Sequence, residues 1–165
     1  MPSHDEVDRI VAAWERERPE LDFTPLQVLS RVTRLARKLE RARKAAFATA
    51  RLEPWEFDVL APLRRSGSPY QLSPKELLSL TGVSSGTMSN RIDRLVERSL
   101  VERRIDPRDG RGVLVVITPE GRSRVDAAIE RLLVAEADLL EGLSRSDQER
   151  VASLLRKLSH SFDSA

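Results

Sequence analysis

The sequence contains no cysteine. Without thiols the chain cannot form disulfides, thiolate zinc sites, iron–sulfur clusters or cysteine nucleophiles, and it cannot sense oxidants through a thiol. Its two histidines, His4 and His160, lie near opposite ends of the chain and are too far apart for a local metal motif. We therefore expect no metal, no cofactor and no catalytic histidine. Redox-responsive and metal-responsive regulators are disfavoured for the same reason.

Long apolar runs are also missing. No stretch approaches the ~20 residues needed to span a bilayer, and the N-terminus is acidic where a signal peptide would be basic. The sequence shows no phosphate-binding loop, no nucleophile elbow and no paired carboxylates at a catalytic motif spacing. It therefore predicts a cytoplasmic protein that makes no membrane contact and is not an enzyme.

Charge is abundant but unevenly placed. A third of the residues are charged, yet 28 basic residues against 26 acidic ones leave a net charge of only +2. Residues 31–51 contain eight bases and one acid, whereas residues 119–165 contain nine acids and seven bases. The total charge predicts no affinity for polyanions, so nucleic-acid binding must be judged from where the basic residues lie.

Apolar residues recur at helical spacing through most of the 165 residues. Thr24 is the expected N-cap of a long basic helix, with Pro25 at its first position. Ser146 and Glu149 form a predicted capping box for the last helix. The predicted helices outside the central segment cover 5–18, 24–50, 54–66, 119–142 and the region from 146 onward. The fold class is therefore mainly α.

The central segment has a different organisation. A short helix over 73–80, a glycine turn at 81–83 and a second helix over 85–98 form a predicted helix-turn-helix. Two β-rich runs, 100–105 and 113–118, flank a loop full of turn-forming residues and predict a hairpin. A hairpin directly after a helix-turn-helix makes it winged, so we predict a winged helix-turn-helix with a small β-hairpin wing.

The second helix of this motif has a polar outer face that suits a DNA groove. Small hydroxyl residues allow close approach, the helix N-terminus favours phosphate, and Asn and Arg side chains can donate to base edges. The predicted DNA contacts are Ser84, Ser85, Thr87, Met88, Asn90, Arg91 and Arg94. An ordinary solvated helix capped by serine would show the same residue types.

Two arginines in the hairpin loop strengthen the DNA-binding interpretation. Arg108 and Arg111 can reach phosphate or a minor groove, and Asp106 is expected to support the wing. Alternatively, these arginines pair with Asp106 and Asp109 in a surface turn. The helix, turn, second helix and basic wing together favour binding to a double-stranded DNA operator over an architectural or interaction module.

A single winged module offers a small interface, so we expect a homodimer that binds half-sites about 10 bp apart or a multiple of that. Apolar stripes at 26–39, 125–143 and 151–158 lie outside the winged module and provide more apolar helix surface than is needed to cover it. They therefore predict a helical dimerisation region. A monomeric helical subdomain is the alternative. Three regions are predicted. Residues 1–51 form N-terminal helices for dimerisation and a ligand pocket, residues 52–118 form the winged helix-turn-helix DNA-binding domain, and residues 119–165 form C-terminal dimerisation helices.

The chain resembles the MarR family of bacterial transcriptional regulators over nearly its whole length. The family's wing carries an Asp-x-Arg-x-x-Arg pattern, which Asp106, Arg108 and Arg111 reproduce after the helix over 85–98. The resemblance implies a triangular winged-helix dimer that binds a near-palindromic operator. It also implies repression of a neighbouring or the same operon, and release by a small ligand that is often aromatic or anionic.

A narrower resemblance concerns the ligand. The extra first helix with Trp14, followed by Asp22 and the basic helix, is similar to the urate-responsive subgroup of this family. That similarity implies a ligand site made by Trp14, Asp58, Arg91 and Arg103, with urate, xanthine or a phenolic anion as the effector. A flat purine anion suits an indole face and a guanidinium, and exchange of an Arg91 partner would shift the recognition helix.

Each of these residues also has an ordinary structural interpretation. Trp14 shares a helix face with apolar neighbours and by default packs the first helix down. Asp58 and Arg91 would then form a structural ion pair, and Arg103 would be a solvated arginine. Trp55 is interpreted as packing at a helix start. A winged DNA-binding regulator without a ligand, and a non-enzymatic architectural module, therefore remain alternative hypotheses.

Overall fold

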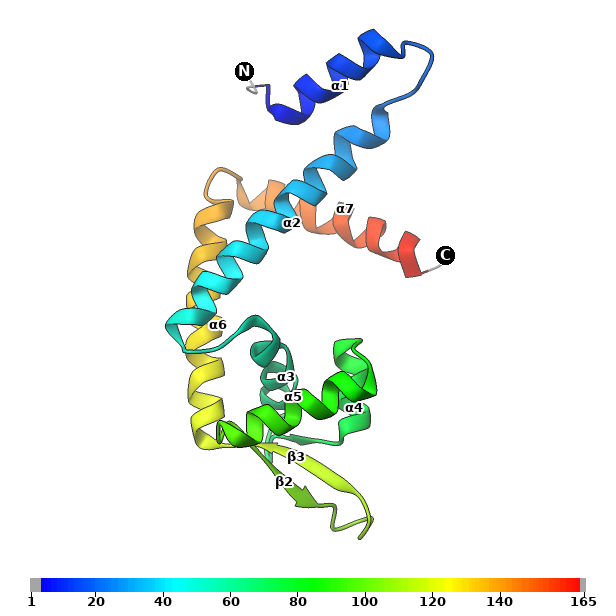
Figure 1. Cartoon of the computed structure of the whole chain (residues 1–165). Coiled ribbons are helices and arrows are strands. Elements are labelled where there is room, and N and C mark those ends of the chain that lie inside the picture. Colours follow the sequence, from blue (N-terminus) through cyan, green and yellow to red (C-terminus); the bar gives the residue numbers. More distant parts are fainter. Residues whose placement is uncertain (1–3, 164–165) are drawn as a thin grey trace. The chain divides into compact units, whose positions relative to one another are not determined.

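The computed structural model describes residues 4–163, and the chain forms two compact units that meet between Arg43 and Lys44. The first unit contains α1 (Glu6–Glu17) and most of α2 (Thr24–Thr49), which are blue to cyan in Figure 1. The second unit contains the last residues of α2 and all later elements. The predicted class, mainly α with a small winged sheet, is confirmed. The assignment of functions to three regions stays a prediction.

In the first unit, side-chain oxygens set where both helices begin. The Asp5 carboxylate caps α1 by accepting from the amides of Val7 and Asp8 at 2.8 and 3.0 Å. The Asp22 carboxylate accepts from the amide of Thr24 at 2.9 Å. Thr24 is already the first residue of α2, so its predicted role as N-cap is wrong. Asp22 supplies the side-chain oxygen two residues earlier instead.

The second unit has one hydrophobic core. It lies between α3 (Pro54–Arg65), α4 (Pro74–Thr81), α5 (Ser85–Glu97) and α6 (Pro119–Leu140). Phe47, near the end of α2, is fully buried and stacks on Phe57 with 4.2 Å between ring centroids. This burial fixes the end of α2 to the rest of the second unit, because a fully buried Phe contributes about 1.5–3 kcal/mol of transfer free energy.

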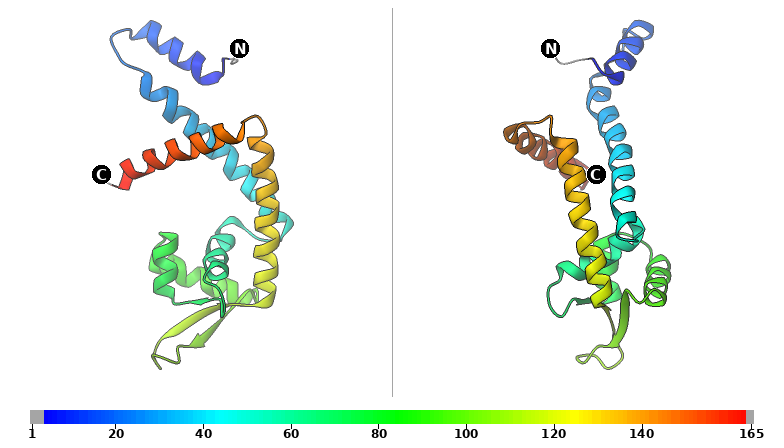
Figure 2. Two further views of the ribbon diagram at one scale, coloured as in Figure 1. Left: turned by 180° about the vertical axis from the view of Figure 1, so that it is seen from behind. Right: turned by 90° about the vertical axis from the view of Figure 1, so that its left-hand side faces the viewer.

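A three-stranded antiparallel sheet completes this unit. It contains β1 (Gln71–Leu72), β2 (Val101–Ile105) and β3 (Val113–Ile117), in the order β1-β3-β2. The predicted hairpin of β2 and β3 is confirmed, and it projects beyond the helices of this unit in both views of Figure 2. The sequence did not predict β1, because two residues are too few for a period-two pattern.

Serine side chains cap both helices of the helix-turn-helix. The Ser73 hydroxyl accepts from the Glu76 amide at 3.2 Å, and the Glu76 carboxylate accepts from the Ser73 amide at 2.7 Å. Gly82 ends α4 in the left-handed region, with φ of 67°, which glycine adopts without steric cost. The Ser84 hydroxyl then accepts from the Thr87 amide at 3.2 Å and caps α5.

The last helix, α7 (Arg145–Asp163), begins earlier than predicted. The Ser144 hydroxyl accepts from the Asp147 amide at 3.2 Å, so the predicted Ser146–Glu149 box is wrong. Both pairs have the same spacing, and the structure uses the one nearer the end of α6. No helix within residues 4–163 is long and apolar enough to cross a bilayer.

Candidate nucleic-acid interface

Helix α5 has one face in the core and one face in solvent. Ile92 and Leu95 are buried, and Met88 is only 1% exposed. Met88 lies four and seven residues before them, which places all three on the same side of the helix. The predicted role of Met88 as a DNA contact is therefore wrong, because its side chain belongs to the core. The other predicted residues lie outside the core, with Arg91 half-buried and the rest exposed: Ser84, Ser85, Thr87, Asn90 and Arg94.

Two arginines of α5 lie over the same indole ring. The guanidinium carbons of Arg91 and Arg94 are 5.9 and 4.8 Å from the ring centroid of Trp55, at the start of α3. Trp55 also packs against the core, as predicted. Its second role as a platform for these arginines was missed, because nothing in a single sequence shows that residues 36 or more positions apart will meet. The contact limits where both guanidiniums can point.

At the wing tip, the two aspartates bind backbone amides. Asp106 Oδ1 accepts from the amide of Arg108 at 2.9 Å, and Asp109 Oδ1 accepts from the amide of Arg111 at 3.2 Å. Among the residues that the structure describes, neither Arg108 nor Arg111 forms an ion pair through its guanidinium. The aspartates therefore shape the loop and leave both charges exposed to solvent.

The wing is also tied to α5 by a salt bridge. Arg103 Nη2 of β2 lies 2.6 Å from Asp93 Oδ1, and the two side chains are 41% and 58% exposed. An exposed pair of this kind contributes at most about 1 kcal/mol. It nevertheless gives Arg103 a partner within the chain.

The four predicted ligand residues lie in both units. Asp58, on the exposed side of α3 one turn after Trp55, belongs to the second unit together with Arg91 and Arg103. Trp14 belongs to the first unit, where it is 50% exposed and its ring stacks on Phe23 at 6.0 Å. Their grouping around one ligand stays a prediction.

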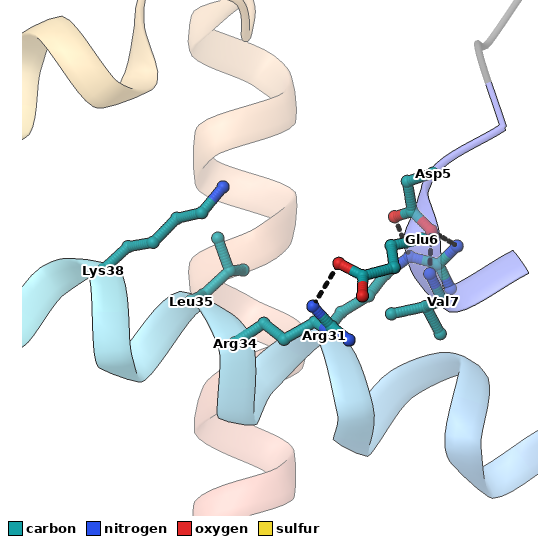
Figure 3. Close-up of a pocket in the computed structure, with 7 residues that line it drawn as sticks. All are labelled: Asp5, Glu6, Val7, Arg31, Arg34, Leu35 and Lys38. Atoms are coloured by element: carbon teal, nitrogen blue, oxygen red, sulfur yellow. Dashed lines mark hydrogen bonds and ion pairs between the residues drawn. The ribbon is translucent and has the colours of Figure 1, made fainter. Parts of the chain in front are cut away.

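The first unit contains a pocket of about 410 Å³ (Figure 3). It includes none of the four predicted ligand residues, and its arginines are already paired. Arg31 contacts Asp5 and Asp8 at 2.9 and 2.8 Å, and Arg34 contacts Glu6 at 2.6 Å. The lining residues are Asp5, Glu6, Val7, Arg31, Arg34, Leu35 and Lys38. We refer to the paired groups as the α1–α2 clasp.

Hydrogen bonds and charge lower the pKa of both aspartates in this clasp. The Asp8 amide and then the Arg31 guanidinium lower the pKa of Asp5 below its ordinary value of 3.8. The Asp5 amide and then Arg31 lower the pKa of Asp8 in the same way. Asp5 and Asp8 are therefore charged at neutral pH. Within residues 4–163, no group of three His, Asp or Glu side chains is placed to hold a metal.

An exposed polar recognition helix followed by a basic hairpin defines a winged helix-turn-helix protein that binds DNA. A model of the MarR family matches residues 52–112, from the α2–α3 loop to the wing tip. The HTH-type transcriptional regulator PecS of Dickeya dadantii is 32% identical over 153 residues, which cover 93% of this chain and 92% of PecS. The chain belongs to the MarR family, and it is a DNA-binding transcriptional regulator.

Solved structures share this architecture. A mutant MarR from E. coli, complexed with operator DNA, is 25% identical with a TM-score of 0.69 and aligns over 84% of this chain and 99% of MarR. BpsR of Bordetella bronchiseptica, whose DNA binding is regulated by 6-hydroxynicotinic acid, is 30% identical with a TM-score of 0.61. That alignment covers 78% of this chain and 92% of BpsR.

Proposed function

We propose that the protein is a homodimeric repressor that binds a near-palindromic operator and is released by a small aromatic anion such as urate or a related purine. One observation carries the DNA-binding half of this proposal. The exposed polar face of α5 and the two exposed wing-tip guanidiniums of Arg108 and Arg111 belong to one compact unit, in which a salt bridge between Arg103 and Asp93 joins the wing to α5.

The residues of this unit divide between two kinds of DNA contact. Asn90 and Arg94 are exposed on α5 and suit hydrogen bonds to base edges in the major groove. The N-terminus of α5, at Ser85, suits a phosphate, and Arg108 and Arg111 suit the backbone or minor groove beside it. Base contacts specify the sequence, whereas phosphate contacts supply most of the affinity.

Two alanine variants test this division. Arg111→Ala should weaken binding to operator and random DNA alike and reduce the salt slope by about one. Asn90→Ala should lower the preference for operator while leaving random-DNA binding unchanged. Arg145→Ala, which removes an exposed arginine of α7, is the matched control and should change neither. Identical losses from Asn90→Ala and Arg111→Ala on both DNAs would contradict the assigned roles.

The dimer proposal is supported by the uncovered apolar stripe of α7. Within the described part of this helix no side chain is buried, although Leu154, Leu155 and Phe162 are large and 46–71% exposed. An amphipathic helix gains most of its stability by covering its apolar face, and a symmetric second copy offers a matching face. Two copies would also present two recognition helices to a palindrome.

The ligand proposal is supported by the regulation of BpsR by 6-hydroxynicotinic acid, an aromatic acid, and by the chemistry of the predicted residues. Arg91 is half-buried on α5, so an anion that draws its guanidinium away would move a side chain of the recognition helix itself. Trp14, Asp58 and Arg103 complete the proposed set. Release requires two positions of α5, one that binds DNA and one that does not. The ligand must bind the protein more tightly when α5 is in the position that does not bind DNA.

Single-tryptophan variants test the ligand. The chain has two tryptophans, so Trp55→Phe leaves Trp14 as the reporter, and Trp14→Phe leaves Trp55. Urate and xanthine should quench Trp14 and weaken operator binding with the same midpoint. Unchanged fluorescence and unchanged operator affinity at millimolar urate and xanthine would remove the purine proposal.

A regulator without a ligand is the second candidate, and two contacts favour it. Trp14 stacks on Phe23, and Arg103 pairs with Asp93, so both side chains have structural partners already. Operator binding that responds to no aromatic anion would support this candidate.

A further inference from the structure

Glu56, in the first turn of α3, is a charged side chain inside the core. It is 1% exposed, and no other charged residue within residues 4–163 is buried to this degree. Burying a carboxylate is costly unless its charge and its oxygens are satisfied. The groups that bond to the Glu56 carboxylate therefore indicate why a buried charge is present at this position.

The Glu56 carboxylate is part of a hydrogen-bond network that joins four segments. Glu56 Oε2 accepts from the amide of Glu53 at 2.8 Å, and Oε1 accepts from Nη1 of Arg98. Nη2 of Arg98 donates to the carbonyl of Arg51 at 2.8 Å. Arg124 of α6 donates to the same carbonyl at 3.4 Å. The α2–α3 loop, α3, α6 and the end of α5 are thus joined by one network.

Arg98 is the C-cap residue of α5, and its amide donates to the carbonyl of Arg94 at 3.1 Å. Glu56 therefore holds the end of the recognition helix, two turns after Asn90. A well-packed apolar pair at such a site is often as stable as a buried ion pair or more so. What this charge-assisted contact adds is a fixed geometry, because a planar guanidinium that bonds Glu56 through one nitrogen and the Arg51 carbonyl through the other has little freedom.

We propose that Glu56 is a positioning residue for operator recognition. Through Arg98 it fixes α5 relative to α3 and α6, so that Asn90 and Arg94 meet the base edges of a half-site in register. This inference rests on the proposed role of α5 as the recognition helix. It goes beyond that role by placing one determinant of operator preference at a residue that does not touch DNA.

Glu56→Gln is the direct test, because glutamine has the same shape and still accepts from the Glu53 amide. It removes the charge that holds Arg98. Measured on the full chain well below its melting temperature, operator affinity should fall about tenfold or more, the scale of a lost base contact. Affinity for random DNA and its salt slope should stay unchanged, because Arg108 and Arg111 are untouched. A folded Glu56→Gln variant with operator affinity within about twofold of the parent would overturn the proposal.

Arg98→Lys keeps the proposal testable if Glu56→Gln does not fold. The Arg98 side chain is 38% exposed, so a lysine is tolerated there, but its single ammonium cannot reproduce the planar fork that joins Glu56 to the Arg51 carbonyl. The Arg98→Lys variant should therefore lose operator preference, as Glu56→Gln does. In a Trp14→Phe background, both variants should also change the emission of Trp55, which lies under Arg91 and Arg94. A lowered melting temperature with unchanged operator preference and unchanged Trp55 emission would indicate a structural role only and would overturn the proposal.

Two controls separate this inference from the function on which it rests. Glu130→Gln removes an equal charge from the exposed face of α6 and should leave operator preference unchanged. Asn90→Ala should lower operator preference. If Asn90→Ala lowers it and Glu56→Gln does not, the positioning role fails alone; if Asn90→Ala has no effect, the recognition-helix proposal fails.

Discussion

At the scale of single residues, Gly121 shows how closely the wing packs on α6. A Cβ atom added there would lie 2.2 Å from the carbonyl oxygen of Leu100 and 2.8 Å from the Ile117 side chain. Gly121→Ala should therefore destabilise the fold by about 1–3 kcal/mol, the usual cost of overpacking. Chemical unfolding measures this loss. Gly142→Ala is the matched control, because a Cβ added there meets nothing within 4 Å, and equal stabilities of the two variants would contradict the packing.

Trp55 is the second residue whose role can be measured. Trp55→Leu keeps an apolar side chain but removes the π face under Arg91 and Arg94, whereas Trp55→Phe keeps a smaller face. Since an exposed cation–π contact contributes about 0.5–1 kcal/mol, Trp55→Leu should weaken operator binding about two- to fivefold and Trp55→Phe less. Anisotropy titration with labelled operator measures both. Equal affinities of the two variants would show that the arginines do not depend on the ring.

Residue roles were predictable from the sequence where they follow from helix spacing or capping. The Ser84 cap and the exposed Asn90 are examples. The predicted DNA contact of Met88 is wrong because it follows from residue type, whereas the helical spacing of Met88 to Ile92 and Leu95 indicates the core face. The contacts of Trp55 and Glu56 depend on tertiary packing, and no local pattern contains them.

At the scale of elements, the α1–α2 clasp should respond to acid. The pKa values of Asp5 and Asp8 are lowered in the folded unit, so the clasp's stabilisation is fully present above their ordinary value of 3.8 and is lost as the pH falls through the lowered values. In a Trp55→Phe variant, Trp14 emission should report this release below pH 3.8. Arg31→Gln should shift the transition upward, and an identical transition in both proteins would contradict the clasp.

Element order and type were largely predictable, because period and capping signals are local. The helix-turn-helix and the hairpin follow from Ser73, Gly82 and the turn-rich loop. The ends of helices were less certain, since two capping patterns can overlap. The capping oxygen of α2 comes from Asp22 and not from Thr24, and that of α7 comes from Ser144 and not from Ser146. In each case the folded chain uses the side-chain oxygen that reaches a free amide of the first turn.

At the scale of the whole molecule, the exposed stripe of α7 predicts self-association. Leu154→Glu places a charge in this stripe and should give a monomer in sedimentation velocity, with loss of tight operator binding. Ser153→Glu adds the same charge outside the stripe and should remain dimeric. If the Leu154→Glu variant remained dimeric, the apolar stripe of α7 would not be the dimer interface.

The central claim is that two copies read one operator through paired α5 helices and wing tips. The most direct measurement is a competition titration of the purified protein on a promoter fragment that contains an inverted repeat, against bulk random DNA at physiological ionic strength. We predict two protomers per site and a preference of about a thousandfold or more for the fragment, provided its half-sites lie about 10 bp apart or a multiple of that. No preference for any such fragment over bulk DNA would contradict the claim.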